Sequence, residues 1–472
     1  MNPSTSPPPS TPDPRPPIKR PPLDLTVHTE KIVHGGQALA RDDRFVVFVD
    51  DALPNETVRA RIYKKKKKFA FGRAIEVLDA SPDRIEPDCP WAGDCGGCSY
   101  RHATYDAQLR FKKDVLVEAL YGIDGAQDLV SDVVPAEAIN DYRNKMVFSF
   151  GTTHDGDLVL GLHRRGSFIH ILPADVCKLQ SEASREIVRR VTALAKEMGI
   201  PAFHEIKKTP GLRTLTIREA RGTGQRLVEL LSTSADDDLA ARLVADLDDL
   251  ADTISFALCT NRHGPPRPEQ RAILKGTGTI EEILNGRRFR IDPDTFFQSN
   301  TAQAERLFSR VNALATRHGR PATALDLFAG TGPIALHLAA IAERVIGVES
   351  FPPSVKAARE NLALNAIENV DLIAADVNKA LPPGIPDHVD LVVVDPPRPG
   401  LSPEAITWIN RLTPETIVYV SCNPATLARD LKRFLEGPYA IEAVEPFDLF
   451  PNTYHVESLT LLRRTSTPVS TD

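Results

Sequence analysis

The last third of the chain alternates short apolar runs with segments of helical periodicity, and each run ends in a polar residue or a glycine turn. This pattern predicts parallel strands separated by helices, the doubly wound α/β architecture. The expected strands, the first with its glycine turn, cover residues 324–332, 344–349, 371–376, 390–395 and 416–422. The expected helices cover residues 333–341, 354–365 and 425–434. Such sheets bind ligands at the carboxyl ends of their strands, where the polar residues lie in this sequence.

The first two thirds follow a different pattern. Runs of β-branched and aromatic residues separated by turn residues predict a small closed β-barrel, with strands over residues 45–49, 57–63 and 71–78. A helical pattern follows at residues 105–120. Residues 133–290 combine many strand patterns with two amphipathic helices, residues 181–198 and 236–250, which predicts a mixed α+β region.

The predicted fold is therefore multidomain, with a small OB-like β-barrel, a mixed α+β central domain and a Rossmann-like α/β domain. Its expected parts are a disordered proline-rich tail (1–22), the barrel (23–81), the central region (82–290) and the α/β domain (291–465).

Composition restricts the class of protein. Hydrophobic residues make up 42% and charged residues 25% of the 472 positions, a globular balance that excludes wholesale disorder. Met1–Pro22 holds ten prolines and no apolar core, which excludes a signal peptide, and no apolar run is long enough for a membrane span. Six cysteines are too few for a disulfide framework, so a reducing cytoplasm is expected.

One strongly basic segment stands out against the net charge of −6. Residues 57–75 contain no acid; their eight cations are Arg59, Arg61, Lys64, Lys65, Lys66, Lys67, Lys68 and Arg73. Tyr63, Phe69 and Phe71 lie among them. Positive charge beside rings that can stack on bases is typical of single-stranded nucleic acid binding, although a solvated lysine loop is the simpler alternative.

A cysteine cluster follows the predicted barrel. Cys89, Cys95 and Cys98 form a C-x5-C-x2-C pattern whose Gly96 and Gly97 allow a tight wrap around one metal centre. A fourth ligand could come from the remaining cysteines, Cys177, Cys259 or Cys422. Cys177 lies in a polar loop, whereas Cys259 lies in an apolar strand and is expected to be a core thiol. The spacing leaves zinc and an iron–sulfur cluster both open.

The acids at the strand ends indicate an adenosyl ligand. The glycine turn is G-T-G rather than G-x-G-x-x-G, and the helix after it opens at Pro333, which has no amide for a pyrophosphate. Glu349 could accept hydrogen bonds from ribose hydroxyls, and Asp376 could accept one from an adenine amine. S-adenosylmethionine, which has no pyrophosphate, fits this set.

Three further residues suggest covalent chemistry on a base. Asp395 opens a rigid Asp-Pro-Pro-Arg segment that could hold a flipped planar base. Cys422 lies between a strand and a helix N-terminus, whose partial positive charge is expected to favour the thiolate. Glu457 is expected to share one face of a strand with His455.

Several of these segments resemble the RNA uridine C5-methyltransferase family. The matching motifs are Asp326-Leu-Phe-Ala-Gly-Thr-Gly, Asp395-Pro-Pro-Arg, Ser421-Cys-Asn-Pro-Ala-Thr-Leu-Ala-Arg-Asp-Leu, His455-Val-Glu-Ser-Leu and Phe296-Phe-Gln-Ser-Asn. The resemblance spans about residues 26–462 and implies a TRAM RNA-binding barrel, a class I methyltransferase domain, S-adenosylmethionine and a [4Fe–4S] cluster.

By that resemblance Cys422 is the nucleophile and Glu457 the base. The cofactor and substrate site would contain Gln298, Phe328, Glu349, Asp376 and Asp395. The cluster ligands would be Cys89, Cys95, Cys98 and Cys177. Two departures affect this assignment: Pro333 stands where the family often has a hydrogen-bonding asparagine, and Asn452 where it often has a histidine.

The expected reaction is methylation of uridine C5 in RNA through a cysteine adduct at C6. The resemblance favours 23S ribosomal RNA over transfer RNA, a monomer and no membrane association. A cytosine C5-methyltransferase would carry a second cysteine after a proline near residue 395, and none is present. A non-catalytic iron–sulfur RNA-binding protein would leave Cys422 and Glu457 without a role.

Overall fold

The computed structural model describes residues 23–465 except positions 44, 124, 154, 262, 263 and 265. The predicted tail, residues 1–22, lies outside this range. The described chain divides into two compact units. The first runs to Val115 and includes residues 452–454, and the second holds residues 116–451 and those from 455 onward. None of the described helices combines the length and apolarity that a membrane span needs.

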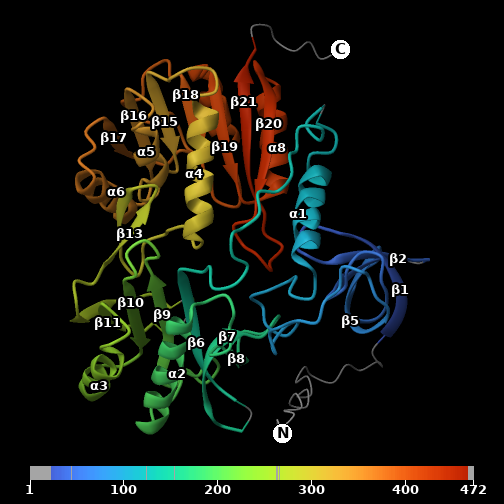
Figure 1. The fold of residues 1–472 in the computed structure, drawn as a ribbon, viewed down its shortest axis with the longest axis vertical. Helices are drawn as coiled ribbons and strands as arrows, with labels where there is room; N and C mark the ends of the chain where they lie inside the picture. The colour runs from blue at the N-terminus through green and yellow to red at the C-terminus, as the bar shows by residue number, and fades with distance from the viewer. Residues whose placement is uncertain are drawn as a thin grey trace. The chain divides into compact units, whose positions relative to one another are not determined.

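The first unit contains the predicted closed barrel (Figure 1). Its strands are β1 (Leu23–Ile32), β2 (Ala38–Asp42), β3 (Phe45–Asp50), β4 (Thr57–Lys65) and β5 (Phe69–Asp79). Their order is β1-β2-β3-β5-β4, and β4 pairs with β1 to close the sheet. Alternate residues such as Val47, Val49 and Val58 fill the interior, because successive side chains of a strand point to opposite faces.

The second unit begins with the end of helix α1 (Tyr105–Ala119) and continues into the central sheet. The strands of that sheet are β6 (Lys145–Thr152), β7 (Leu158–His163), β8 (Ile171–Pro173), β9 (Leu212–Glu219), β10 (Arg226–Ser232), β11 (Thr253–Leu258) and β12 (Gln270–Lys275). Helices α2 (Glu182–Glu197) and α3 (Asp237–Leu247) pack on one of its faces. A hairpin of β13 (Ile280–Leu284) and β14 (Arg287–Ile291) follows, so the predicted α+β character is confirmed.

The predicted α/β domain forms a second seven-stranded sheet in the order β17-β16-β15-β18-β19-β21-β20 (Figure 1). Its strands are β15 (Thr323–Leu327), β16 (Arg344–Glu349), β17 (Val370–Ala374), β18 (Leu391–Val394), β19 (Thr416–Ser421), β20 (Tyr439–Phe447) and β21 (Glu457–Arg464). Its helices are α4 (Thr301–Ala315), α5 (Pro333–Leu338), α6 (Pro352–Leu364), α7 (Pro403–Leu412) and α8 (Pro424–Leu435). One apolar core joins α4, α5 and α6 to the sheet, and another joins α7 and α8 to it.

Several predicted boundaries were wrong. The helix expected to reach residue 341 ends at Leu338, and the strand expected to reach Asp376 ends at Ala374. His455 does not share a strand face with Glu457, because β21 begins only at Glu457. The segment before it turns at Asn452, whose φ of 65° is left-handed and incompatible with a strand.

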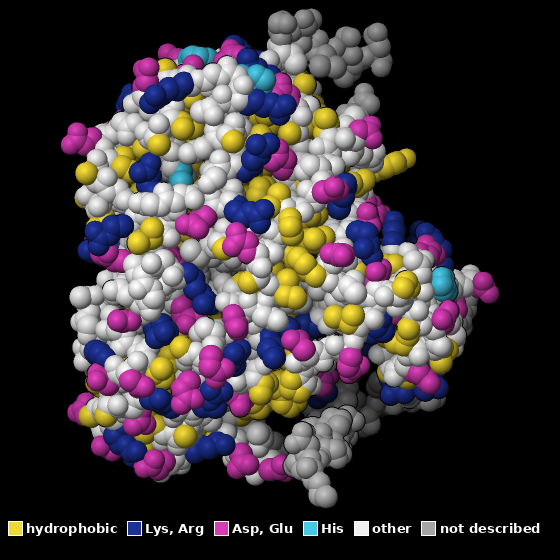
Figure 2. All heavy atoms as spheres, in the orientation of Figure 1, with side chains coloured by type: hydrophobic (Ala, Val, Ile, Leu, Met, Phe, Trp, Pro, Cys, Tyr) yellow, Lys and Arg dark blue, Asp and Glu magenta, His cyan; other side chains and the backbone are white. Residues whose placement is uncertain are grey.

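Charge is spread over the face of the molecule in Figure 2, where Lys and Arg side chains are interspersed with Asp and Glu. In the basic segment of the barrel, residues 57–75, three arginines form ion pairs with acids from other parts of the first unit. Arg59 pairs with Glu76, Arg61 with Asp24, and Arg73 with Asp51 and Asp94. The run of Lys64–Lys68 is exposed and forms no ion pair with the described residues.

Candidate active site

The glycine-rich turn after β15 is tightly folded. Phe328 has a φ of 65°, a left-handed value that is uncommon for a bulky residue. Gly332 follows with a φ of 86°, and α5 begins at Pro333. Pro333 occupies the first helical position, where a missing N–H costs no helical hydrogen bond. The turn therefore has room over Gly330, where an added Cβ would have only the Phe328 carbonyl oxygen, at 4.0 Å, as a neighbour.

Glu349 joins this turn to the next strand. Its Oε2 accepts a hydrogen bond from the Gly330 N–H at 3.0 Å, and its Oε1 accepts one from the Phe351 N–H at 2.7 Å. Oε1 also accepts a hydrogen bond from the Ser350 hydroxyl at 3.3 Å, so Oε2 is the oxygen that keeps a lone pair for a ligand hydroxyl. The position at the carboxyl end of β16 and the remaining lone pair of Oε2 are compatible with a hydrogen bond from a ribose hydroxyl, which stays a prediction.

A buried carboxylic acid lies beneath the turn. Asp326, inside β15, is fully buried, and burial raises its pKa to about 8, with further contributions from the charges of Asp395 and Glu349. Asp395 follows β18 and is half-buried; loss of hydration raises its pKa to about 7. Acids on neighbouring parallel strands thus repel one another and favour their neutral forms.

Cys422 and Glu457 are neighbours because of strand pairing. Strands β19 and β21 are antiparallel, with Ser421 opposite Ser458. Continuing this register by one residue places Cys422, which follows Ser421, opposite Glu457, which precedes Ser458. Cys422 is half-buried between β19 and α8, and Glu457 is 4% exposed. Burial and the charge of Asp395 raise the pKa of Glu457 well above its usual value.

The expectation that the helix N-terminus favours a thiolate was wrong for this structure. Burial, followed by the charges of Glu457 and Asp395, raises the pKa of Cys422 to about 11, and the charge of Arg398 only partly opposes this. Three acidic groups share a poorly hydrated site, and burial together with their mutual repulsion favours the neutral thiol.

Two residues near this site, Arg398 and His455, were not identified as functional from the sequence. Arg398 lies 3.5 Å from His455, measured from Nη2 to Nε2. The Arg398 carbonyl oxygen accepts hydrogen bonds from Asn423 and Thr426, which ties the loop after β18 to the start of α8. The Asp-Pro-Pro-Arg and His-Val-Glu motifs contain both residues, so the signal was present in the sequence.

The remaining predicted residues are less closely connected. Asp376 accepts a hydrogen bond from the Asn378 N–H at 3.0 Å and lies 3.7 Å from Lys379. The Gln298 carbonyl oxygen accepts a hydrogen bond from Asn144 at 2.8 Å. Among the described residues, neither side chain forms a hydrogen bond or ion pair with Cys422, Glu457, Asp395 or Glu349.

The cysteines of the predicted cluster belong to different units. Cys89, Cys95 and Cys98 lie in the first unit and are half-buried, whereas Cys177 lies in the second. The Gly97 N–H donates to Cys95 Sγ at 3.3 Å. No three His, Cys, Asp or Glu side chains in the described part of the chain form a group that could hold a metal ion. Cys259 is fully buried in the core, as expected.

Comparison with known families agrees with the two-part architecture. Residues 23–75 match the TRAM domain, residues 387–465 match the tRNA (uracil-5-)-methyltransferase family, and residues 279–397 match the TRM5/TYW2 methyltransferase domain. The second match contains both Cys422 and Glu457.

Relatives align over nearly the whole chain. An uncharacterized RNA methyltransferase of Clostridium tetani is 36% identical over 93% of this chain and 98% of its own length. One of Gloeobacter violaceus is 38% identical over 93% of this chain and 96% of its own. A solved structure, the Pyrococcus abyssi tRNA (uracil-54, C5)-methyltransferase with S-adenosyl-L-homocysteine, is 26% identical, with a TM-score of 0.74 over 93% of this chain and 100% of that one. The chain belongs to the RNA uracil-5-methyltransferase family.

Proposed function

We propose that this enzyme methylates C5 of a uridine in RNA through a covalent bond between Cys422 and C6 of the base. The observation that carries the proposal is the β19–β21 register, which brings a cysteine and a buried carboxyl group side by side. S-adenosylmethionine supplies an electrophilic methyl group. The turn above Gly330 and the carboxylate of Glu349 fit its ribose, and Phe328, Asp376 and Gln298 are proposed to complete the cofactor site.

Uracil C5 is a poor nucleophile until C6 is substituted. The Cys422 thiol must first release its proton to solvent. Addition of the resulting thiolate to C6 places negative charge on the C4 oxygen and C5, and C5 can then take the methyl group. Glu457 is proposed to remove the C5 proton afterwards, so that the C6–sulfur bond breaks and the double bond re-forms. Asp395 is proposed to face the base and, with its raised pKa, to donate a hydrogen bond to it at neutral pH.

The test is transfer of a labelled methyl group to transcribed RNA, followed by nuclease digestion and identification of 5-methyluridine. Cys422→Ala should abolish the product. Labelled 5-methylcytidine, or product formation by Cys422→Ala, would contradict the proposal.

For the RNA target we propose large-subunit ribosomal RNA, on the family resemblance described above. Transfer RNA is the second candidate, because the similar Pyrococcus abyssi enzyme is a tRNA (uracil-54, C5)-methyltransferase. Mapping 5-methyluridine in both RNA classes from a deletion strain distinguishes them, since only the true target loses the modification. Both RNA classes and a reactive thiol are consistent with the reducing cytoplasm, which we propose as the location.

We also propose that Cys89, Cys95, Cys98 and Cys177 bind a [4Fe–4S] cluster with a structural role. The C-x5-C-x2-C spacing supports this, as does the Gly97 N–H on Cys95, because amides commonly donate to cluster sulfurs. The side chain of Arg101 is buried; burial alone would lower its pKa, but the nearby Cys98, Asp88 and Cys89 raise it. A cation at this position would offset the charge of thiolates.

Iron and sulfide analysis of anaerobically purified protein tests the cluster. Wild-type protein should be brown, Cys177→Ala should lose the colour, and Cys259→Ala should keep it because Cys259 is a core thiol. Stoichiometric zinc without iron would refute the assignment.

A further inference from the structure

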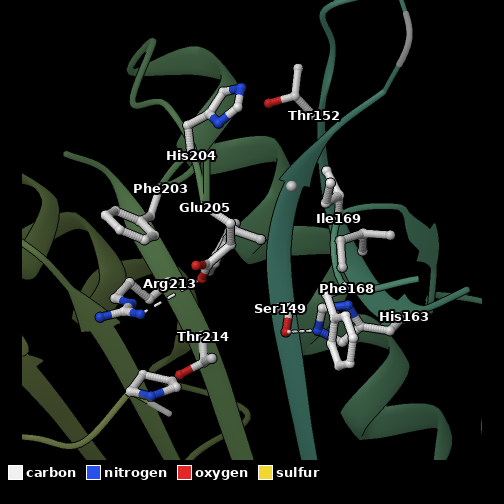
Figure 3. A pocket seen from close by; sticks show the side chains of 14 residues that line it. Ser149, Thr152, His163, Phe168, Ile169, Phe203, His204, Glu205, Arg213 and Thr214 are labelled. Carbon is white, nitrogen blue, oxygen red and sulfur yellow. Dashed lines mark hydrogen bonds and ion pairs between the residues drawn. The ribbon is translucent and has the colours of Figure 1, made fainter. Parts of the chain in front are cut away.

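The central sheet carries a hollow that the proposed reaction does not use. Helices α2 and α3 cover one face of the sheet and pack against Met146, Phe148 and Leu215. Ser149 and Thr214 are cross-strand neighbours, and strand alternation points them to the opposite face. A hollow of about 170 Å³ lies there, several times the roughly 30 Å³ share of one water molecule (Figure 3).

The lining of the hollow combines the uncharged polar side chains of Ser149, Thr214 and His163 with one ion pair, Arg213–Glu205. Ser149 Oγ and His163 Nε2 are 3.1 Å apart, as the dashed line in Figure 3 marks. Burial lowers the pKa of His163, so its ring is neutral at physiological pH. Gly151 lets Ile171 pack on the strand, since a Cβ at Gly151 would lie only 2.6 Å from Ile171 Cγ1. Neutral donors and acceptors beside apolar surface suit a polar planar ring rather than an ion.

Three phenylalanines line the hollow and differ in how accessible their rings are; Phe150 is buried in the core. Phe203 is covered by the Arg213 guanidinium, 4.4 Å from its ring centroid, and Arg213 is in turn 3.7 Å from Glu205. Phe168 is 88% exposed, more than any other large hydrophobic side chain in the described part of the chain. Figure 3 shows Phe203 and Arg213 on one side and Phe168 and His163 on the other. Phe168 therefore offers a ring face to a ligand.

The surrounding charge indicates which planar ligand fits. The two loops at the rim, residues 163–171 and 203–211, contain Arg164, Arg165, Lys207 and Lys208 but only one acid, Glu205. Lys208 is paired with Glu205, and the other three cations lie in the loops beside the hollow rather than in its lining, where they can neutralise the phosphates that flank a stacked base.

We propose that this hollow binds one unstacked nucleobase of the RNA substrate, stacked on Phe168, with its edge toward Ser149 and Thr214 and its flanking phosphates on the rim cations. It is a second base site, separate from the one at Cys422, and it positions RNA rather than taking part in chemistry. The inference rests on the proposed RNA substrate but not on the identity of the methylated base.

The experiment measures the affinity of the full-length enzyme for a fluorescein-labelled, 12-nucleotide single-stranded RNA by anisotropy. Phe168→Ala and Phe168→Leu should weaken binding about tenfold, because stacking on one aromatic ring is lost, while Phe168→Trp should stay within about twofold. Tyr121→Ala is the matched control, because Tyr121 is a 77% exposed aromatic residue outside the hollow. The salt dependence should not change in the Phe168 variants, since no phosphate contact is removed.

Two results would overturn the proposal. Wild-type affinity in Phe168→Leu would mean that no ring is stacked there, and equal affinity in Phe168→Ala and Tyr121→Ala would assign the patch to another ligand, such as a protein. Methyl transfer to transcribed RNA separates this inference from the proposed function. Normal transfer with a normal KM in Phe168→Ala refutes only the base site, whereas Phe168-dependent binding without transfer by wild-type enzyme refutes only the function.

Discussion

The residues proposed to react are held in a state that suppresses their charge. Cys422, Glu457 and Asp395 are all acids in a poorly hydrated site, and each has a raised pKa. A neutral thiol is protected from oxidation and alkylation, because the thiolate is the reactive form. The proposed nucleophile, Cys422, is therefore expected to be inactive until substrate binding changes its surroundings.

Alkylation of Cys422 in the free enzyme tests this state. The rate of iodoacetamide modification, followed on the peptide that contains Cys422, should rise with pH through a midpoint well above the ordinary cysteine value of about 8.5. In Glu457→Gln the midpoint should fall, because removing a negative charge makes the thiolate easier to form. A midpoint below that of free cysteine in the wild-type enzyme would contradict the structure.

A trapped intermediate tests the two proposed roles separately. Glu457→Gln keeps the side-chain shape but cannot take the C5 proton, so the methylated base should remain bonded to Cys422. With S-adenosylmethionine and transcribed RNA, this variant should form a labelled complex that survives denaturing electrophoresis. The control is Glu457→Gln combined with Cys422→Ala, in which the complex must vanish. A persistent complex would assign the nucleophile to another residue.

At the scale of elements, strand ends carry the candidate chemistry and the exposed turn of the barrel carries the charge. Two lysines at the end of β4 lie near aromatic rings: Lys64 is 5.5 Å from the Phe71 ring and Lys65 is 4.7 Å from the Phe45 ring. Phe71 also stacks on Phe48, with ring centroids 5.4 Å apart. The cluster presents cations and rings together, a combination that binds RNA without reading sequence.

Replacing Lys64–Lys68 with glutamine should weaken RNA binding by a similar factor for substrate and scrambled RNA. The slope of log affinity against log salt should become shallower by about 0.7 for each lysine that contacts a phosphate. Arg189→Gln with Arg190→Gln on α2 is a suitable control, because those arginines are already paired with acids. A loss confined to the substrate sequence would indicate base recognition by the lysines instead.

At the scale of the whole molecule, the first unit is built from two distant parts of the chain. Residues 452–454 belong to it although they are more than 330 positions beyond Val115. The Asn452 carbonyl oxygen accepts hydrogen bonds from the N–H groups of Ser99 and Tyr100, and Gln108 bonds both the N–H and the side chain of Asn452. Asn452, the departure from the family's histidine, thus has a structural role within this unit.

Hydrogen exchange can detect this dependence. The Ser99 and Tyr100 amides should be protected in the full-length protein and exchange quickly in a fragment ending at residue 115, which lacks Asn452. The amide of Val49 in β3 should stay protected in both, because its partners lie within the barrel. Equal protection of Tyr100 in the two proteins would show that Asn452 is dispensable for this unit.

Much of this protein is determined by the sequence alone. The barrel, the central α+β region and the alternating strands and helices follow from local periodicity, because apolar spacing directly reflects which faces are buried. The motifs around Asp395, Cys422 and Glu457 likewise point to the residues of the proposed site. These features depend on neighbours within about ten positions.

The tertiary structure decided what depends on distant partners. The raised pKa of Cys422 arises from burial and from acids 27 and 35 positions away, so the local helix end gave the wrong sign. The start of β21 at Glu457 follows a left-handed turn at Asn452, which is held by residues near position 100. The hollow beside Phe168 is lined by residues of four separate strands, β6, β7, β8 and β9, and of the loops between them. Burial, charge coupling and cavities are properties of the packed chain, and no local pattern encodes them.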